Sequence, residues 1–405
     1  MRGRTMGLTE VITLLLGLTG FGIQPNPRPA TPDAVLAYAL PDPDLVVHLD
    51  VTSLVPGNLK TLSALADQPT IKASPDLARA MRQLVTEVES ARGVAKTMTG
   101  VDLATDVSDV TAFFHIVPGH DPDAVVEAHG KFSTATIDKI AGAVHKPATR
   151  TKDGGEQVEM PDGKAIAVTH DGVLLAGTSA LIAARTGGGW RMPAHGAGTN
   201  LAYTAETIAQ HPVFSVVFTG APAAREAALA GHADDHDLFA DLMKRHKAAG
   251  IAVFHDGIGW FWVDTTKAGL DDFAQMSDGM IDLLRAAQVA PRGFAKIALG
   301  ALDSYRGKSP QVDAVIARKG DLMKLVDTYT GDGKFKANVS TDPKALRLTV
   351  RLVGKTTSEV VPVGVIVPLA AIGAFAARDE AARPQLVAPS PSQVRPAAAP
   401  PAPRR

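Results

Sequence analysis

The chain has 405 residues, enough for two ordinary domains with terminal extensions. Hydrophobic residues make up 45% of it, which allows sizeable cores and argues against global disorder. Lys and Arg number 41 and Asp and Glu 42, so no basic field attracts nucleic acid and we expect no nucleic-acid partner. Cysteine is absent, which excludes disulfides, thiolate metal sites, cysteine nucleophiles and a lipidated N-terminal cysteine.

The N-terminus has the pattern of an export signal. Two arginines in the first four residues precede an apolar core over 11–23, and a proline-rich stretch follows. Because the cleavage site is poor, residues 1–30 are either a cleaved signal peptide or a retained signal anchor. Residues 31–42 then form a linker. In both cases the N-terminal arginines stay in the cytoplasm, and the body of the protein lies outside it.

Residues 43–190 are predicted to form a first α+β unit. Its first elements are a strand, turn and helix start over 44–60, a helix over 75–99 and a strand over 109–117. A helix over 122–144, which Gly130 could break, a meander of short antiparallel strands over 155–178 and a short helix in "SALIAART" follow. Two Asp-Gly pairs mark the turns of the meander.

After a linker at 191–210, a similar order of elements returns over 211–353. These elements are a strand over 212–220 with an Ala-rich helix after it, a hairpin over 250–266, a helix over 271–290, a strand, turn and helix over 313–330, and a last strand pair around Asp342 and Pro343. The repeated order predicts an α+β fold of two similar units, each a mainly antiparallel sheet covered by helices. Two unrelated α+β domains are the alternative.

The segment from Val360 to Ala377 contains 18 residues and no charge. As a helix it would measure about 27 Å, close to the hydrocarbon thickness of a bilayer. The tail over 378–405 is rich in Pro, Ala and Arg, which predicts disorder and, by the positive-inside rule, a cytoplasmic location. We therefore predict a transmembrane helix over 360–377 that anchors a periplasmic ectodomain to the inner membrane. A buried C-terminal helix is the alternative.

Two packing motifs support the same placement. The opening strand "DLVVHLDV" and the strand-to-helix turn "VLLAGTSALI", together with the export segment and the repeated body, resemble uncharacterised bacterial envelope proteins with a duplicated α+β ectodomain. The resemblance covers residues 1–353. It implies a place in the cell envelope and supplies no catalytic residues.

The best polar cluster is "GHADDHDLF". His232 and His236 stand one helical turn apart, and Asp235 offers an oxygen ligand, a donor set that zinc accepts. The other interpretation is a solvated helix N-terminus, where aspartates interact favourably with the helix dipole. We favour this second interpretation because no motif fixes a third ligand.

Three further histidines, His48, His115 and His255, lie in apolar strand or turn segments. We expect each to face solvent or to be buried with a hydrogen bond, instead of converging on one site. The sequence also has no Gly-x-Ser-x-Gly, Ser-x-x-Lys or His-Glu-x-x-His motif.

Together these features predict a membrane-tethered envelope protein whose ectodomain is a binding or scaffolding module without catalysis or cofactor. Its expected partners are the membrane and other envelope proteins. The alternative is an exported metal-dependent hydrolase with zinc at His232, Asp235 and His236.

Overall fold

The computed structural model describes residues 30–54, 92–102, 104–116, 122–219, 245–307 and 333–355. It also describes isolated positions at 64, 82, 86, 89, 90, 313, 316, 317, 319, 320, 323, 324 and 360. The export segment before residue 30, the apolar run after Val360 and the C-terminal tail therefore lie outside the described residues.

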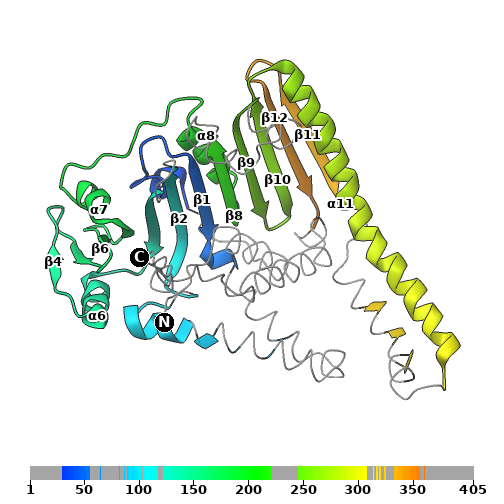
Figure 1. The fold of residues 1–405 in the computed structure, drawn as a ribbon, viewed down its shortest axis with the longest axis horizontal. Coiled ribbons are helices and arrows are strands. Elements are labelled where there is room, and N and C mark those ends of the chain that lie inside the picture. Colours follow the sequence, from blue (N-terminus) through cyan, green and yellow to red (C-terminus); the bar gives the residue numbers. More distant parts are fainter. Residues whose placement is uncertain are drawn as a thin grey trace, which may run out of the picture.

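Twelve strands in the described residues form one antiparallel sheet (Figure 1). They are β1 (Leu45–Asp50), β2 (Val107–His115), β3 (Asp123–Gly130), β4 (Ala148–Arg150), β5 (Glu156–Glu159), β6 (Lys164–Val168), β7 (Leu174–Thr178), β8 (Phe214–Thr219), β9 (His246–Phe254), β10 (Gly257–Asp264), β11 (Lys336–Asp342) and β12 (Arg347–Val353). Their order across the sheet is β11-β12-β10-β9-β8-β1-β2-β3-β7-β6-β5-β4. The prediction of an α+β fold with a mainly antiparallel sheet is confirmed.

The two expected units share this sheet instead of forming one sheet each. Strands β1 and β8, which open the two halves, pair antiparallel in the middle, with Val47 opposite Val216. Both strands are rich in β-branched and aromatic residues, and their pairing covers two edges that separate sheets would expose. From this centre the halves run β1-β2-β3-β7 and β8-β9-β10-β12. Duplication of one unit stays a prediction.

Helices cover both faces of the sheet. They include α2 (Pro32–Val35), α6 (Thr134–Val144), α7 (Ser179–Arg185), α8 (Asn200–Ile208) and α11 (Lys267–Leu302), which a short 3-10 turn (Asp303–Tyr305) follows. Residues 51–54 and 92–99 are also helical, and the latter lie in the helix predicted over 75–99. In β6, Ala167 packs with Ile182 of α7, whereas the next residue, Val168, packs with Ile137 of α6. Because successive strand residues point to opposite faces, α7 and α6 lie on opposite sides of the sheet.

The stretch 122–144 forms β3 and then α6, so the prediction of one helix there is wrong for its first part. Ala and Glu favoured a helix in "DAVVEAHG", but pairing with β2 and β7 overrides this preference. The buried Val125 and Glu127 occupy alternate positions of β3, as a covered sheet face requires. Helix α6 begins only after Ser133, whose side chain forms a capping box with Thr136.

The segment 191–210, expected to be a linker, contains helix α8. Its residues Leu201 and Ile208 are 1% exposed and pack with α2 against the sheet. The side chain of Thr199 caps the helix by accepting a hydrogen bond from the Ala202 amide at 3.2 Å. This segment therefore belongs to the core of the fold.

Other expected elements match the structure. The meander is formed by β5, β6 and β7, and Gly163 and Gly172 adopt positive φ angles of 76° and 82° at its turns. The hairpin of β9 and β10 and the pair of β11 and β12 are also present. In the stretch 313–330, where a strand, a turn and a helix were expected, the described positions are all helical and none is in a strand.

Candidate functional site

Helix α11 is fixed to the sheet by its first half. Its first turn is capped by Thr266, whose Oγ1 accepts a hydrogen bond from the Gly269 amide at 3.0 Å. The ring of Phe273 stacks on Trp262 of β10, with 4.3 Å between centroids. Trp260 of the same strand donates from Nε1 to Ser277 Oγ at 3.1 Å. The helix then continues past the end of the sheet (Figure 1).

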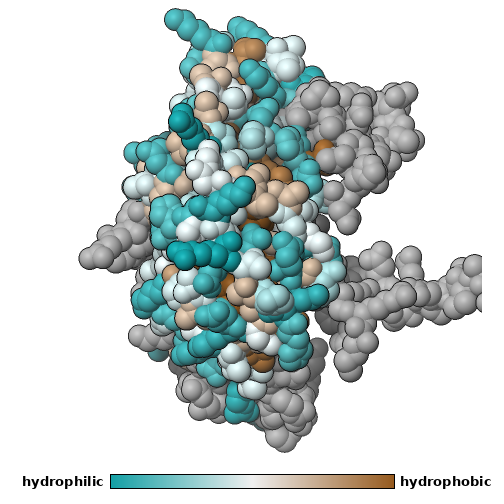
Figure 2. All heavy atoms as spheres, turned by 90° about the vertical axis from the view of Figure 1, so that its left-hand side faces the viewer, coloured by the Kyte–Doolittle hydropathy of each residue, from teal (hydrophilic) through white to brown (hydrophobic). Residues whose placement is uncertain are grey.

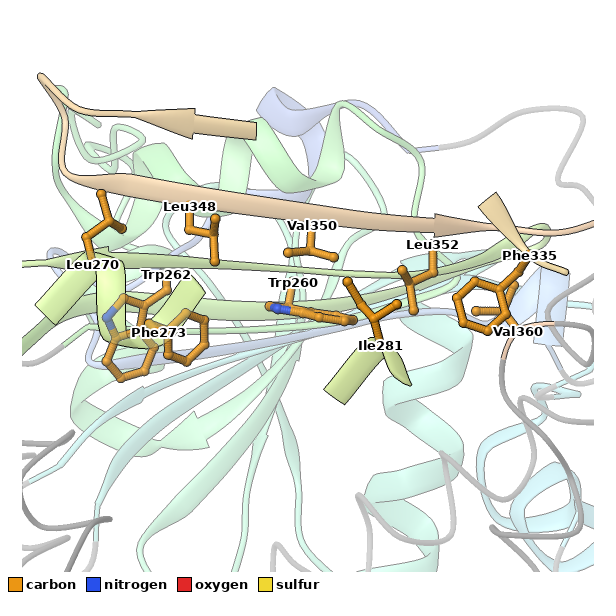
Figure 3. Close-up of a cluster of buried hydrophobic side chains, with 10 residues drawn as sticks. All are labelled: Trp260, Trp262, Leu270, Phe273, Ile281, Phe335, Leu348, Val350, Leu352 and Val360. Atoms are coloured by element: carbon orange, nitrogen blue, oxygen red, sulfur yellow. The ribbon is translucent and has the colours of Figure 1, made fainter. Parts of the chain in front are cut away.

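A cluster of buried apolar side chains packs α11 against β10 and β12 (Figure 3). It consists of Trp260, Trp262, Leu270, Phe273, Ile281, Phe335, Leu348, Val350, Leu352 and Val360. These side chains come from β10, β12 and α11 and from two flanking positions, so the cluster ties α11 to this half of the sheet.

A cavity of about 530 Å³ adjoins this cluster, between α11 and strands β8, β9 and β10. The described side chains that line it are all apolar, and they include Phe218, Ile251, Trp260, Trp262, Met276, Met280 and Leu283. Its volume falls within the range of about 300–1,000 Å³ typical of small-molecule sites. The cavity is open to solvent, since Leu283 and Met280 at its margin are 68% and 38% exposed.

The two indole N–H groups of the cavity lining already have partners. The indole Nε1 of Trp260 donates to Ser277, and that of Trp262 donates to Asp264 Oδ2 at 3.1 Å. Among the described lining residues there is no titratable side chain and no nucleophile. The described lining is therefore suited to holding an apolar molecule by exclusion of water, and none of its side chains offers a group for acid–base or covalent chemistry.

The β4 end of the molecule differs from this region. Figure 2 shows that the described residues on this side present a mainly hydrophilic surface, with apolar residues scattered over it. Scattered apolar residues are normal for any protein surface.

A cluster of polar side chains lies on the face of the sheet opposite the α11 cavity, under α2 and α8. Buried His48 in β1 stands opposite Thr111 and Ser215, and its Nδ1 lies 2.9 Å from Thr111 Oγ1. In the neighbouring strands, His129 Nδ1 lies 2.8 Å from Asp109 Oδ1, and its Nε2 lies 3.2 Å from Glu127 Oε1. Strand pairing thus brings two histidines and two carboxylates into one buried area.

The surroundings of the two histidines shift their pKa values in opposite directions. Burial lowers the pKa of His48 to about 4, so its ring is neutral at pH 7. Burial also acts to lower the pKa of His129, but its pairing with Asp109 and Glu127 outweighs this and raises the pKa to about 10. His129 is therefore a cation that bridges β2 and β3. None of these residues lines the α11 cavity, so we assign them a structural role.

The predicted zinc residues His232, Asp235 and His236 lie outside the described residues. In the part of the chain that the structure describes, no group of three or more His, Asp and Glu side chains is placed to hold a metal ion. The zinc hydrolase alternative stays a prediction. Stoichiometric zinc in the purified chain, lost when both histidines are replaced by Ala, would support it.

The prediction that His48, His115 and His255 each face solvent or are buried with a hydrogen bond is confirmed. His48 is buried with a hydrogen bond, as described above. His115 is partly exposed, and its Nδ1 lies 3.0 Å from Asp44 Oδ2. His255 is exposed in the turn between β9 and β10.

The predicted membrane helix lies outside the described residues except for its first residue. Val360 is fully buried in the cluster between α11 and the sheet. Among the helices that the structure describes, none combines the length and apolarity needed to span a bilayer. The transmembrane assignment of 360–377 stays a prediction.

The chain shows distant likeness to solved structures. Crystal form III of TP0453 is 8% identical with a TM-score of 0.36, covering 83% of this chain and 97% of that one. Crystal form I is 9% identical with a TM-score of 0.33, covering 83% and 96%. No family model and no curated protein matches the chain. A likeness this low carries no argument about function.

Sequence reasoning missed the α11 cavity, although part of its signal is in the sequence. In "GIGWFWVD" the alternation of β10 places Ile258, Trp260 and Trp262 on one face of the strand. In α11, Met276, Met280 and Leu283 recur at helical spacing. Nothing in the sequence, however, indicates that these two faces meet without filling the space between them.

Proposed function

We propose that this chain is a non-catalytic binding module of the bacterial cell envelope, and that its ligand is an apolar molecule held in the α11 cavity. The observation that carries the proposal is the open cavity of about 530 Å³ with only apolar side chains among its described lining. Transfer of apolar surface from water into such a site is favourable by about 25 cal/mol per Å².

The ligand is expected to have a linear or flexible apolar part, such as an acyl chain. The lining includes two methionines, Met276 and Met280, whose unbranched side chains adapt to different shapes. The indole donors at the cavity are occupied, so no side-chain donor of the described lining is left to select a rigid polar ligand. Each methylene that enters the site should contribute about 0.8 kcal/mol, roughly a four-fold gain in affinity, until the cavity is full.

Tryptophan fluorescence tests this proposal directly. Trp260 and Trp262 line the cavity, whereas Trp190 packs against Arg185 in another part of the molecule. In a Trp190→Phe chain the emission therefore reports the cavity alone. Brominated fatty acids of increasing chain length should quench this emission with saturation, and the apparent Kd should fall with each added methylene.

Two arginine variants, one at the mouth of the cavity and one far from it, test whether the ligand binds there. Leu283→Arg places a cation at a lining position that is 68% exposed, so the fold should tolerate it. We expect binding at least about ten-fold weaker, since an apolar chain would have to desolvate the charge. Val339→Arg on edge strand β11, at a position 46% exposed, should leave binding unchanged. Unsaturable quenching, or equal affinity in both variants, would refute the proposal.

The envelope location rests on the two ends of the sequence. The basic and apolar N-terminus supports export, and the uncharged run 360–377 with its arginine-biased tail supports an inner-membrane anchor with a periplasmic ectodomain. The membrane and other envelope proteins are then the proposed partners.

Duplication is the proposed origin of the body. The matching orders β1-β2-β3-β7 and β8-β9-β10-β12 support it, as does the antiparallel pairing of β1 with β8 at the centre. Segments 43–190 and 211–353 of an experimental structure should then superpose. Different paths of the chain through corresponding strands would contradict the duplication.

A further inference from the structure

The two end strands of the sheet differ in what they offer to a further strand. At one end β4 has only three residues, so it presents few backbone groups for pairing. At the other end β11 has seven residues, contains no proline and pairs with β12 without a register shift. Its residues are exposed except for Ala337, which is partly buried. No described strand lies on its outer side, so β11 is a long and regular open edge.

Hydrogen bonds of the neighbouring strands show which backbone groups of β11 point outward. At the two ends of the β10–β12 pair, the Asp264 amide donates to Leu346 O at 3.0 Å and the Gly354 amide donates to Asp256 O at 2.7 Å. Because hydrogen-bonded positions alternate along an antiparallel ladder, even-numbered residues of β12 face β10 and odd-numbered ones face β11. These odd-numbered residues pair with even-numbered residues of β11. The N–H and C=O groups at the open edge are therefore those of Ala337, Val339 and Thr341.

The sequence of β11 is complementary to itself in the antiparallel direction. Lys336 and Asp342 each stand three residues from Val339, so a second copy centred on Val339 places each lysine opposite an aspartate. The same register places Ala337 opposite Thr341 and Val339 opposite its equivalent. Each outward-facing residue then meets another outward-facing residue, and all their N–H and C=O groups form hydrogen bonds.

The charges at the two ends of β11 suit this register. Lys336 and Asp342 are both exposed. Asp342 Oδ1 accepts hydrogen bonds from the Ala345 and Lys344 amides at 3.1 and 2.9 Å, which lowers the pKa of this carboxyl and keeps it charged at neutral pH. A lysine on an edge strand usually discourages pairing, but here each lysine would face a carboxylate of the other copy.

We propose that two copies of this chain associate through β11, in an antiparallel strand pair centred on Val339 that extends the sheet across a two-fold axis. The assembly closes as a dimer, because each copy has one long open edge. Val339 stands opposite Val350 of β12, which points to the α11 side of the sheet. Opposite residues of a strand pair share a face, so the α11 cavities of both copies lie on the same face of the joined sheet.

The absence of cysteine makes the register of this pair testable. In a full-length Val339→Cys chain, the thiols of two copies face each other with about 5.5 Å between Cα atoms, within the range of a disulfide. Mild oxidation should therefore link two copies. The matched control is Ala337→Cys, whose two thiols lie out of register. This chain should not link to itself, but it should link to a Thr341→Cys chain when the two are mixed.

Charge reversal tests the contacts at the ends of the strand. Lys336→Glu puts two pairs of like charges into the dimer, so association should weaken at least about ten-fold in sedimentation of the full-length chain in mild detergent. Asp342→Lys should act in the same way. A mixture of these two variants should associate again, because each introduced charge then faces an opposite one. Lys267→Glu, at the exposed start of α11, should leave association unchanged.

Three results would overturn the proposal. The first is a chain that sediments as a monomer at every concentration and gives no link at 339, which would leave the edge to a strand of a different protein. The second is an Ala337→Cys chain that links to itself as readily as Val339→Cys. The third is a mixture of the two charge variants that associates no better than either alone. None of these variants lies in the α11 cavity, so this proposal and ligand binding fail independently.

Discussion

His48 and His129 lie in β1 and β3, on either side of β2, but affect stability in opposite pH ranges. Burial holds the pKa of His48 near 4, below the ordinary 6.5, so the unfolded chain takes up this proton first as the pH falls from 6.5 to 4. The pKa of His129 is near 10, because ion pairs with Asp109 and Glu127 outweigh burial. Its contribution is complete below pH 6.5 and is lost as the pH rises to 10.

These two shifts predict a stability maximum near pH 6.5. Each histidine contributes on the order of a few kcal/mol across its own range. Urea unfolding between pH 4 and 10 should therefore give a free energy that falls on both sides of the maximum. His48→Gln should remove most of the loss on the acid side, and His129→Gln should remove most of the loss on the alkaline side.

His255→Gln is the control for this experiment, because His255 is exposed in a turn. It should leave both slopes unchanged. His129→Gln should also be less stable than the natural chain at pH 6.5, since it leaves the buried Asp109 and Glu127 without their cation. A free energy that is flat from pH 6.5 to 10 in the natural chain would contradict the assignment of His129 as a cation.

At the scale of elements, the first half of α11 depends on a few contacts with β10. Phe273 is 7% exposed and stacks on Trp262, and Ser277 is fully buried as the acceptor for Trp260. Phe273→Ala should destabilise the protein by about 3–5 kcal/mol, because it removes a buried ring and leaves a cavity. Ser277→Ala should cost about 1–3 kcal/mol, because it leaves a buried indole N–H without an acceptor.

Chemical unfolding with tryptophan emission as the signal measures both changes. Leu283→Ala on the same helix is the comparison, because Leu283 is 68% exposed and should change the free energy of unfolding by no more than about 0.5 kcal/mol. If Phe273→Ala and Leu283→Ala changed the free energy of unfolding equally, the contacts of α11 with Trp260 and Trp262 would not be what holds the helix.

At the scale of the whole molecule, the central pairing of β1 with β8 makes one sheet out of both halves of the chain. Membrane attachment, by contrast, depends on the ends of the chain and not on this sheet. The full chain should pellet with membranes, whereas a chain that ends at Val360, and so retains the buried valine, should stay in the soluble fraction. Cell fractionation without detergent measures the difference.

The side of the membrane on which the C-terminus lies gives a second test of the predicted membrane anchor. A tag placed after Arg405 should resist protease added from the periplasmic side, because the arginine-biased tail is expected in the cytoplasm. If both chains are equally soluble, the run 360–377 packs onto the body of the protein instead. If the tag is cleaved, the predicted orientation is wrong.

The features that depend on local pattern could be predicted from the amino-acid sequence. Alternating apolar residues and Asp-Gly turns predicted the meander and the β9–β10 hairpin correctly. Helical spacing predicted α11, although the structure extends it to Lys267–Leu302. The hydrogen-bonded or exposed state of His48, His115 and His255 also followed from their positions in apolar strands and turns.

The features that depend on distant partners could be read only from the folded chain. The segment with Glu127 became a strand because β2 and β7 lie on either side of it, and the linker at 191–210 became α8 because the sheet offered an apolar face. The pairing of β1 with β8, which joins both halves, also depends on distant partners. The same holds for the cavity beside α11. Local patterns reveal which residues seek burial, but what they bury against, and how completely, is set by packing between segments far apart in the chain.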